Sequence, residues 1–189
     1  MTIQDRRQRE RTAQRRLIMA TARTLAEREG WDAVTTRRLS AEIEYSQPVL
    51  YKHFASMEEL AEAVALEGFD ELAGTLRAAR LGAGPVGDAL RRTAQAFSEF
   101  AAGHPALYDV MFSRATRLYF GPDGTAAPQH TAFGELHAAV ATVAHDRDSE
   151  TLTEVLWAAL HGLITLGRSG RLRPGHDDER IALLVASVA

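Results

Sequence analysis

Apolar residues recur along most of the chain at three- and four-residue spacing, which is typical of α-helices, and no strand-like alternation stands out. The first apolar stripe is formed by Ile18, Ala22, Leu25 and Ala26. Gly30 follows this stripe in the position where glycine commonly ends a helix. The pattern predicts a helix over about residues 8–29. Because similar helical spacing continues along the chain, it also predicts an all-α fold, and no internal repeat is visible.

Two short helices joined by a tight turn are predicted between residues 35 and 54, which read TTRRLSAEIEYSQPVLYKHF. Thr35 can cap a helix that runs to about Ile43. After a turn at residues 44–45, Ser46 can cap a second helix, with Pro48 in its first turn, where a missing N–H costs little. This arrangement is the form of a helix-turn-helix.

The remaining chain reads as longer helices. Ser56 and Glu59 form a capping box that opens a long helix to about Arg80. Further helices are predicted at 88–102, 106–112, 129–146, 149–167 and 177–188, with Gly- or Pro-rich loops at 81–87, 121–128 and 169–175. We therefore expect an N-terminal domain of three helices over residues 1–55 and a larger helical domain over residues 56–189, joined through the long helix without a flexible linker.

Composition narrows the class of protein. The absence of cysteine excludes disulfides and thiolate metal sites and suits a reducing cytoplasm. No apolar run approaches the ~20 residues of a membrane span. The histidines lack HxH or HxxxH spacing, so we expect no metal and no cofactor. No serine or cysteine nucleophile lies near a plausible base and no glycine loop could cradle phosphate, so we do not expect an enzyme.

The net charge of −3 hides a division along the chain. Residues 1–55 hold 11 basic and 7 acidic side chains, whereas residues 56–189 hold 11 and 18. The basic N-terminal part favours a polyanionic partner, although chance asymmetry is the alternative. Basic charge is concentrated in Arg6, Arg7, Arg9, Arg11, Arg15 and Arg16. We expect residues 1–14 to form a disordered basic arm that follows a DNA backbone or enters its minor groove, with a solvated tail as the alternative.

The second short helix places polar side chains beside apolar anchors. Leu50 and Phe54, four residues apart, are expected to point inward. Gln47 suits a bidentate contact with adenine, and Lys52, the only lysine, suits guanine or a phosphate. The candidate DNA-binding residues are Thr36, Arg37, Ser46, Gln47, Pro48, Tyr51, Lys52 and His53. Alternatively, Tyr51 packs over the small core and His53 is a surface residue without a role.

Residues 15–64 resemble the DNA-binding region of the TetR (tetracycline-repressor-like) family of transcriptional regulators. The likeness rests on the first helix, an aromatic residue after Gly30, and the run Leu50-Tyr51-x-His53-Phe54. The sequence departs from the family pattern at three positions: Glu44 replaces a glycine, Tyr45 a smaller aliphatic residue, and Met57 a lysine. If residue 44 is left-handed, glutamate costs ~1 kcal/mol relative to glycine.

The C-terminal part resembles a TetR subgroup with a Trp-x3-His-Gly pattern, formed here by Trp157, His161 and Gly162. Gly162 is expected to allow a close helix approach. The resemblance implies that helices 149–167 and 177–188 form a homodimer interface, which their broad apolar surfaces also favour. It also implies a small-molecule pocket, for which the candidate residues are Phe97, Phe100, Tyr108, Met111, Phe112, Phe133, Trp157 and His161. The alternative is that these aromatic residues are core.

Together these features predict a homodimeric TetR-like regulator that binds a palindromic operator in double-stranded DNA. The resemblance implies a repressor that a small apolar or amphipathic effector releases from the operator. The alternative is a ligand-independent DNA-binding dimer that a protein partner controls.

Overall fold

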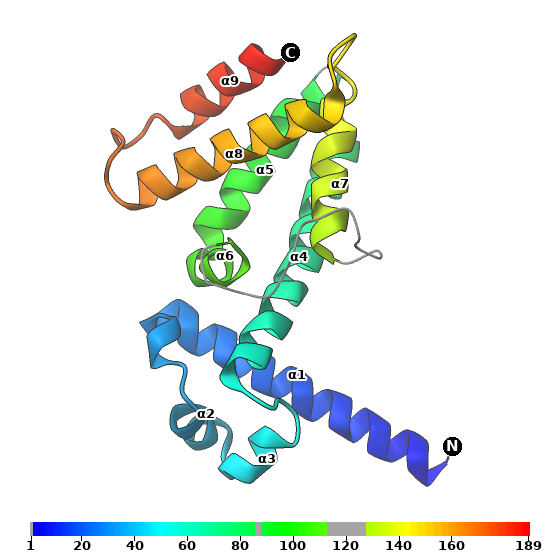
Figure 1. Ribbon diagram of the computed structural model, residues 1–189, viewed down its shortest axis with the longest axis vertical. Coiled ribbons are helices and arrows are strands. Elements are labelled where there is room, and N and C mark those ends of the chain that lie inside the picture. The colour runs from blue at the N-terminus through cyan, green and yellow to red at the C-terminus, as the bar shows by residue number, and fades with distance from the viewer. Residues whose placement is uncertain (1, 86–87, 113–127) are drawn as a thin grey trace. The chain divides into compact units, whose positions relative to one another are not determined.

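The computed structural model describes residues 2–85, 88–112 and 128–189. These residues form nine α-helices and a short 3₁₀ turn at residues 31–33, with no strand among them (Figure 1). The predicted all-α fold is therefore confirmed. The described chain divides into two compact units, one containing residues 2–68 and 104–112 and the other containing the remaining described residues.

Unit 1 is built around a long first helix. Its elements are α1 (Ile3–Glu29), η1 (Trp31–Ala33), α2 (Thr36–Ile43), α3 (Gln47–Tyr51), the first half of α4 (Met57–Leu81) and α6 (Pro105–Phe112). Its buried core includes Ile18, Leu25, Leu39, Leu50, Phe54 and Leu60. Apart from Phe54, which follows α3, these residues lie on α1 to α4, so the short helices α2 and α3 share one apolar core with the longer α1 and α4.

The expectation of a disordered arm over residues 1–14 is wrong, because α1 begins at Ile3 rather than near residue 8. Thr2 and Asp5 form a reciprocal capping box, with the Asp5 N–H donating to Thr2 Oγ1 at 3.2 Å and the Thr2 N–H donating to the Asp5 carboxylate at 2.9 Å. No glycine or proline interrupts residues 3–29. The arginine-rich start is therefore a helical extension of α1.

Helix α6 joins unit 1 through hydrogen bonds to the end of α1 and to η1. The Glu27 carboxylate accepts from the N–H groups of Ala106 and Leu107 at 3.0 and 2.9 Å. The Trp31 indole N–H donates to the Ala106 carbonyl at 2.7 Å. Glu27 thus satisfies N–H groups in the first turn of α6, which the helix itself cannot do.

A glycine allows α4 and α6 to approach closely within unit 1. A Cβ added at Gly68 would lie 2.7 Å from Met111 Sδ and 2.8 Å from Leu107 Cδ1. The expected close approach at Gly162 is wrong for the single chain, since a Cβ there would meet nothing within 4 Å among the described residues.

Unit 2 contains the second half of α4 with α5 (Ala89–Gly103), α7 (Pro128–Val140), α8 (Ser149–Arg168) and α9 (Asp177–Val188). Arg80 on α4 and Glu135 on α7 form a largely buried ion pair at 2.6 Å. Asp148 caps α8 by accepting from the Thr151 N–H at 3.0 Å. In the described ranges, no helix is both long and apolar enough to cross a membrane.

Apart from the start of α1, most predicted helix boundaries are confirmed within one or two residues, and the end of α7 is not. Helix α7 ends at Val140 rather than at 146. The N–H groups of Thr142 and Val143 donate to carbonyls three residues earlier, those of Ala139 and Val140, which is a tight turn and not a continued α-helix. The predicted loop over residues 121–128 lies outside the described residues except for Pro128. The predicted domain boundary after residue 55 lies inside unit 1 and stays a prediction.

The Glu27 contacts can be tested by the substitution Glu27→Ala. It leaves two amide groups at the start of α6 without their charged acceptor, so we expect the free energy of unfolding to fall by about 1.5–3 kcal/mol. Urea denaturation measures the change, with Glu67→Ala on the exposed side of α4 as the control. Equal stability of the two variants would contradict a structural role for Glu27.

Candidate nucleic-acid interface

A sharp turn sets the direction of α3 relative to α2. Thr35 caps α2 as predicted, accepting from the Arg38 N–H at 3.3 Å. Glu44 ends α2 in the left-handed conformation, with φ 56° and ψ 29°, and its N–H and that of Tyr45 both donate to the Ser40 carbonyl. A glutamate in this conformation costs ~1 kcal/mol relative to glycine. The turn is therefore kept at some cost in stability.

Helix α3 has only five residues and depends on its anchors. Ser46 occupies the position before the helix but its side chain makes no capping hydrogen bond to the described chain, whereas Pro48 lies in the first turn as predicted. Leu50 and Phe54 are buried as predicted and border the same small gap in the packing as Ile18 of α1. A helix this short is unstable alone, so this burial holds it in place.

The outer face of α3 is open to solvent. Ser46, Gln47, Pro48 and Lys52 are all exposed, and 54% of Tyr51 is accessible. The Tyr51 hydroxyl lies 3.5 Å from Thr36 Oγ1 in the first turn of α2. The structure thus brings the end of α3 and the start of α2 together as one polar surface.

Positive charge on this surface is unevenly neutralised. Arg28 and Arg38 share the carboxylates of Glu29 and Glu42 at N–O distances of 2.8 to 3.5 Å. Arg28 is the main cause of the lowered pKa of Glu42. The side chains of Arg37 and Lys52, in contrast, have no hydrogen bond or ion pair with any described residue. These two cations are available to a phosphate.

Arg15 connects α1 to the end of α3, a role that sequence reasoning missed. Its guanidinium donates to the His53 carbonyl, lies 3.9 Å from the centre of the Phe54 ring and is 3.7 Å from the Glu59 carboxylate. By sequence, Arg15 is only one member of an arginine-rich cluster. The i, i+3 spacing from Arg15 to the buried Ile18 was the available indication that its side chain lies near the core.

His53 lies apart from the exposed face, since only 9% of it is accessible. Its Nδ1 is enclosed without a hydrogen-bond partner among the described residues. Burial, followed by the positive charges of Arg11, Arg15 and Lys52, lowers the pKa of His53. The ring is therefore neutral near pH 7, and its predicted contact with phosphate stays a prediction.

The candidate ligand residues fall into two groups. In unit 2, Phe97 and Phe100 are buried, and the partly exposed rings of Phe133 and Trp157 meet edge to face with centroids 6.3 Å apart. On the same helix as Trp157, burial lowers the pKa of His161. In unit 1, Tyr108 and Met111 are buried, and the Tyr108 and Phe112 rings lie 4.6 Å apart.

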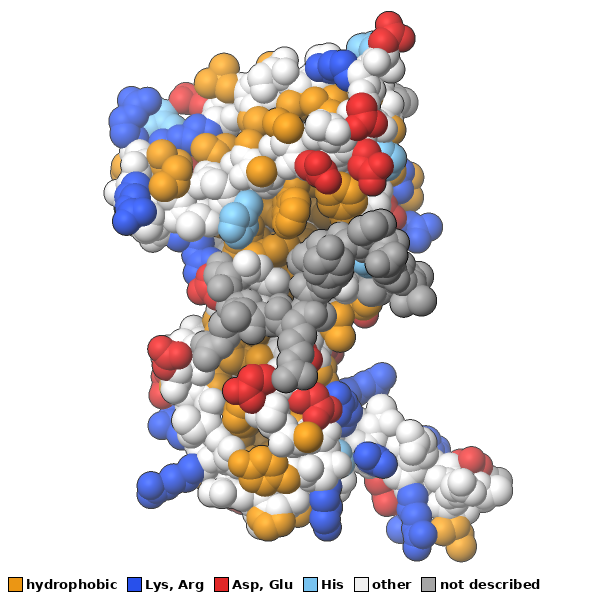
Figure 2. Space-filling view, viewed as in Figure 1, with side chains coloured by type: hydrophobic (Ala, Val, Ile, Leu, Met, Phe, Trp, Pro, Cys, Tyr) orange, Lys and Arg blue, Asp and Glu red, His pale blue; other side chains and the backbone are white. Residues whose placement is uncertain are grey.

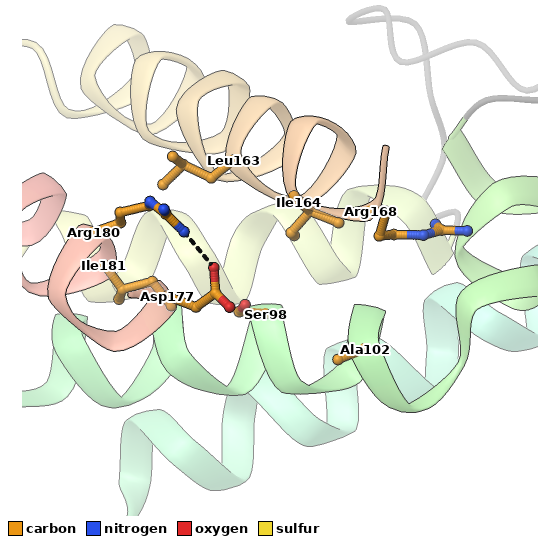
Figure 3. Close-up of a pocket in the computed structure, with 9 residues that line it drawn as sticks. Ser98, Ala102, Leu163, Ile164, Arg168, Asp177, Arg180 and Ile181 are labelled. Carbon is orange, nitrogen blue, oxygen red and sulfur yellow. Dashed lines mark hydrogen bonds and ion pairs between the residues drawn. The ribbon is translucent and has the colours of Figure 1, made fainter. Parts of the chain in front are cut away.

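Unit 2 also contains a pocket of about 260 Å³ between α5, α8 and α9 (Figure 3). Leu163, Ile164 and Ile181 provide apolar walls. Asp177 and Arg180 form an ion pair at 2.8 Å beside them. None of the eight candidate ligand residues is among the described residues that line this pocket, so sequence reasoning did not find it.

An exposed second helix on buried anchors, preceded by a sharp turn and flanked by two cations without a partner in the described chain, defines a DNA-binding helix-turn-helix protein. The comparisons with known proteins agree. Residues 18–64 match the model of the tetR family of bacterial regulatory proteins, and residues 90–188 match that of the tetracyclin repressor-like C-terminal domain. The chain therefore belongs to the TetR family of transcriptional regulators, which bind DNA as dimers.

Relatives support this assignment. An uncharacterised helix-turn-helix-type transcriptional regulator of Mycobacterium tuberculosis, Rv0681, is 32% identical over 161 residues, covering 82% of this chain and 71% of that protein. A Rhodococcus sp. RHA1 protein of unknown function is 24% identical with a TM-score of 0.76, covering 92% of each chain. A TetR family regulator from Marinobacter aquaeolei VT8 is 17% identical with a TM-score of 0.68, covering 96% of each. The two solved structures show the fold.

The buried His53 predicts a pH dependence of stability. Its pKa is lowered in the folded state, so as the pH falls below the unfolded value of about 6.5 the unfolded chain binds a proton first and the folded state loses stability. His161 acts in the same direction, since its pKa is also lowered. His53→Gln should therefore reduce, without abolishing, the loss of stability between about pH 7 and pH 5.

Urea denaturation across this pH range measures the effect. His145→Gln, on an exposed turn, removes a histidine without disturbing a buried site and serves as the control. A pH dependence in His53→Gln as steep as that of the wild type would show that the ring is not enclosed.

Proposed function

We propose that this protein is a repressor that occupies a palindromic operator as a homodimer and leaves it when a small apolar or amphipathic effector binds. The observation that carries the proposal is the exposed face of α3, where Gln47, Tyr51 and Lys52 project from a helix anchored by Leu50 and Phe54. Occupying an operator is the simplest way for such a protein to change transcription.

The residues of this face have distinct proposed roles. Gln47 reads a base, since its amide can donate to and accept from adenine in the major groove. Thr36, Arg37, Ser46 and Tyr51 contact phosphates, which fixes the register of α3 on the duplex. Pro48 packs against the groove edge, and Lys52 contacts guanine or a phosphate. His53 contributes from the buried side, where it supports the end of α3.

Dimerisation through α8 and α9 is supported by their exposed apolar side chains. Val155 and Leu166 on α8 and Leu183 on α9 are accessible, Leu183 to 72%, and Figure 2 shows hydrophobic side chains over both helices. Burying such side chains against a second copy removes apolar surface from water. It also pairs two α3 helices for half-sites ~34–36 Å apart.

An effector site around Phe133, Trp157 and His161 is supported by their partial exposure. Aromatic edges with a neutral imidazole nearby suit an apolar or amphipathic molecule. These residues include two members of the Trp-x3-His-Gly pattern, and we propose that the chain belongs to that subgroup. Within unit 2, the buried Phe97 and Phe100 then form the walls or support behind this site.

The DNA-binding roles can be tested with a duplex selected from a random-sequence library by the wild-type protein. Arg37→Ala and Lys52→Ala should each weaken binding, and the slope of log K against log salt should fall by about 1 for each phosphate that the variant no longer neutralises. Arg77→Ala makes the same charge change on α4 in unit 2, at an exposed arginine that has no partner among the described residues. This control should bind as the wild type does.

Two results would contradict the DNA-binding proposal. One is a wild-type protein that selects no duplex at moderate salt. The other is an equal effect of Arg37→Ala and Arg77→Ala, which would mean that net charge rather than the α3 surface controls binding.

The effector can be tested by screening small molecules for release of the wild-type protein from the selected duplex. Trp157→Ala should need about five- to tenfold more of a releasing compound, because it removes an aromatic contact worth roughly 1–1.5 kcal/mol, while DNA binding itself is unchanged. Glu154→Ala, exposed on the same helix, is the control. If no compound releases the protein, control by a protein partner becomes the better account.

A further inference from the structure

The N-terminal half of α1 is a helix without a packing partner in the described chain. Residues 2–13 are all exposed, and Figure 1 shows this end of α1 extending beyond the other helices of unit 1. An isolated helix of this length is only marginally stable in water, so continuity with the anchored part of α1 sustains it. We call residues 3–14 the α1 extension.

The α1 extension and its junction supply the positive charge of the DNA-reading region. Residues 1–16 contain six arginines and two acidic residues, Asp5 and Glu10. Residues 17–55, which hold the helix-turn-helix itself, contain five basic and five acidic residues. The helix-turn-helix is thus formally neutral, and the net attraction of this region for a polyanion comes from the start of α1.

The arrangement of residues along α1 gives the extension a direction. Ile18, Ala22 and Leu25 form the face that packs on the core of unit 1. The same face continues toward the N-terminus, by helical periodicity, through Gln4, Arg7, Arg11, Gln14 and Arg15. No carboxylate lies on this row, and Glu10 is paired with Arg6 at 2.9 Å beside it. The apolar stripe of α1 therefore becomes a basic stripe.

Contacts within unit 1 place this stripe next to the end of α3. Arg15 touches the His53 carbonyl and the Phe54 ring. The charges of Arg11 and Lys52 both lower the pKa of the His53 ring, so both lie close to it. Arg7 lies one helical turn further along the same row and, like Arg11, has no side-chain hydrogen bond or ion pair with a described residue.

We propose that the α1 extension is a second DNA-contacting element, a basic helix that lies along the phosphates flanking the bases read by α3. Its row of Arg7 and Arg11 continues the surface that begins at Lys52. Twelve helical residues span about 18 Å, which corresponds to roughly five base pairs of flanking duplex. In Figure 2, basic side chains are visible along this helix, all of them arginines. The inference rests on the proposed DNA-binding function and extends its footprint.

The test uses the full-length protein and a duplex selected by the wild type. The double variant Arg7→Gln/Arg11→Gln should lower the slope of log K against log salt by about 2 for each bound chain. Trimming roughly five base pairs from each flank should weaken the wild type but not the double variant. Arg16→Gln is the matched control, because Arg16 is also exposed and without a partner in the described chain but points away from the Arg7 row.

The outcomes separate this inference from the proposed function. Selection of no duplex by the wild type would overturn both. Specific binding with the same salt slope in the wild type and the double variant would overturn the α1 extension alone, as would an equal effect of Arg16→Gln. Dissociation of the dimer by the double variant would make the extension a protein-contact surface and overturn the inference as well. Circular dichroism and thermal melting establish that each variant is folded.

Discussion

Burial of Leu50 and Phe54 is the interaction on which the proposed DNA-binding surface depends. Five residues cannot maintain a helix in water, so the position of α3 follows from Leu50 on its inner face and Phe54 just after its end. Both side chains border the same small gap in the packing as Ile18 of α1 and Leu39 of α2. Because these anchors occupy the inner face, Gln47, Tyr51 and Lys52 are left on the outer one. The apolar core therefore determines which polar groups can meet a duplex.

The same unit contains an element far from α3 in sequence. Two hydrogen-bonding side chains hold the first turn of helix α6. Glu27 accepts hydrogen bonds from its backbone N–H groups, and Trp31 donates one to a backbone carbonyl. A single residue, His104, separates α6 from the end of α5 in unit 2. Helix α4 runs from unit 1 into unit 2 without a break. Two helical connections thus join the DNA-reading unit to the unit with the proposed effector site.

Local sequence features predicted most of the fold. Thr35, Pro48 and the buried pair of Leu50 and Phe54 were identified correctly because capping and helical spacing depend on residues a few positions apart. The α1 extension was wrongly expected to be disordered, because the expectation rested on its many arginines and did not include the Thr2–Asp5 capping box. The contacts of Glu27 with α6 join residues about 80 positions apart. No local pattern contains that information, and the same holds for the α5–α8–α9 pocket.

The central claim is that the outer face of α3 reads bases, and the most direct test is the base preference of a Gln47 variant. Binding sites should be selected from a random-sequence library by the wild type and by Gln47→Ala, and the two profiles compared at each position. We predict that the preference is lost at one position of each half-site and kept elsewhere, since a single side chain contacts one base pair. An unchanged profile would contradict the claim, because Gln47 would then not face the bases.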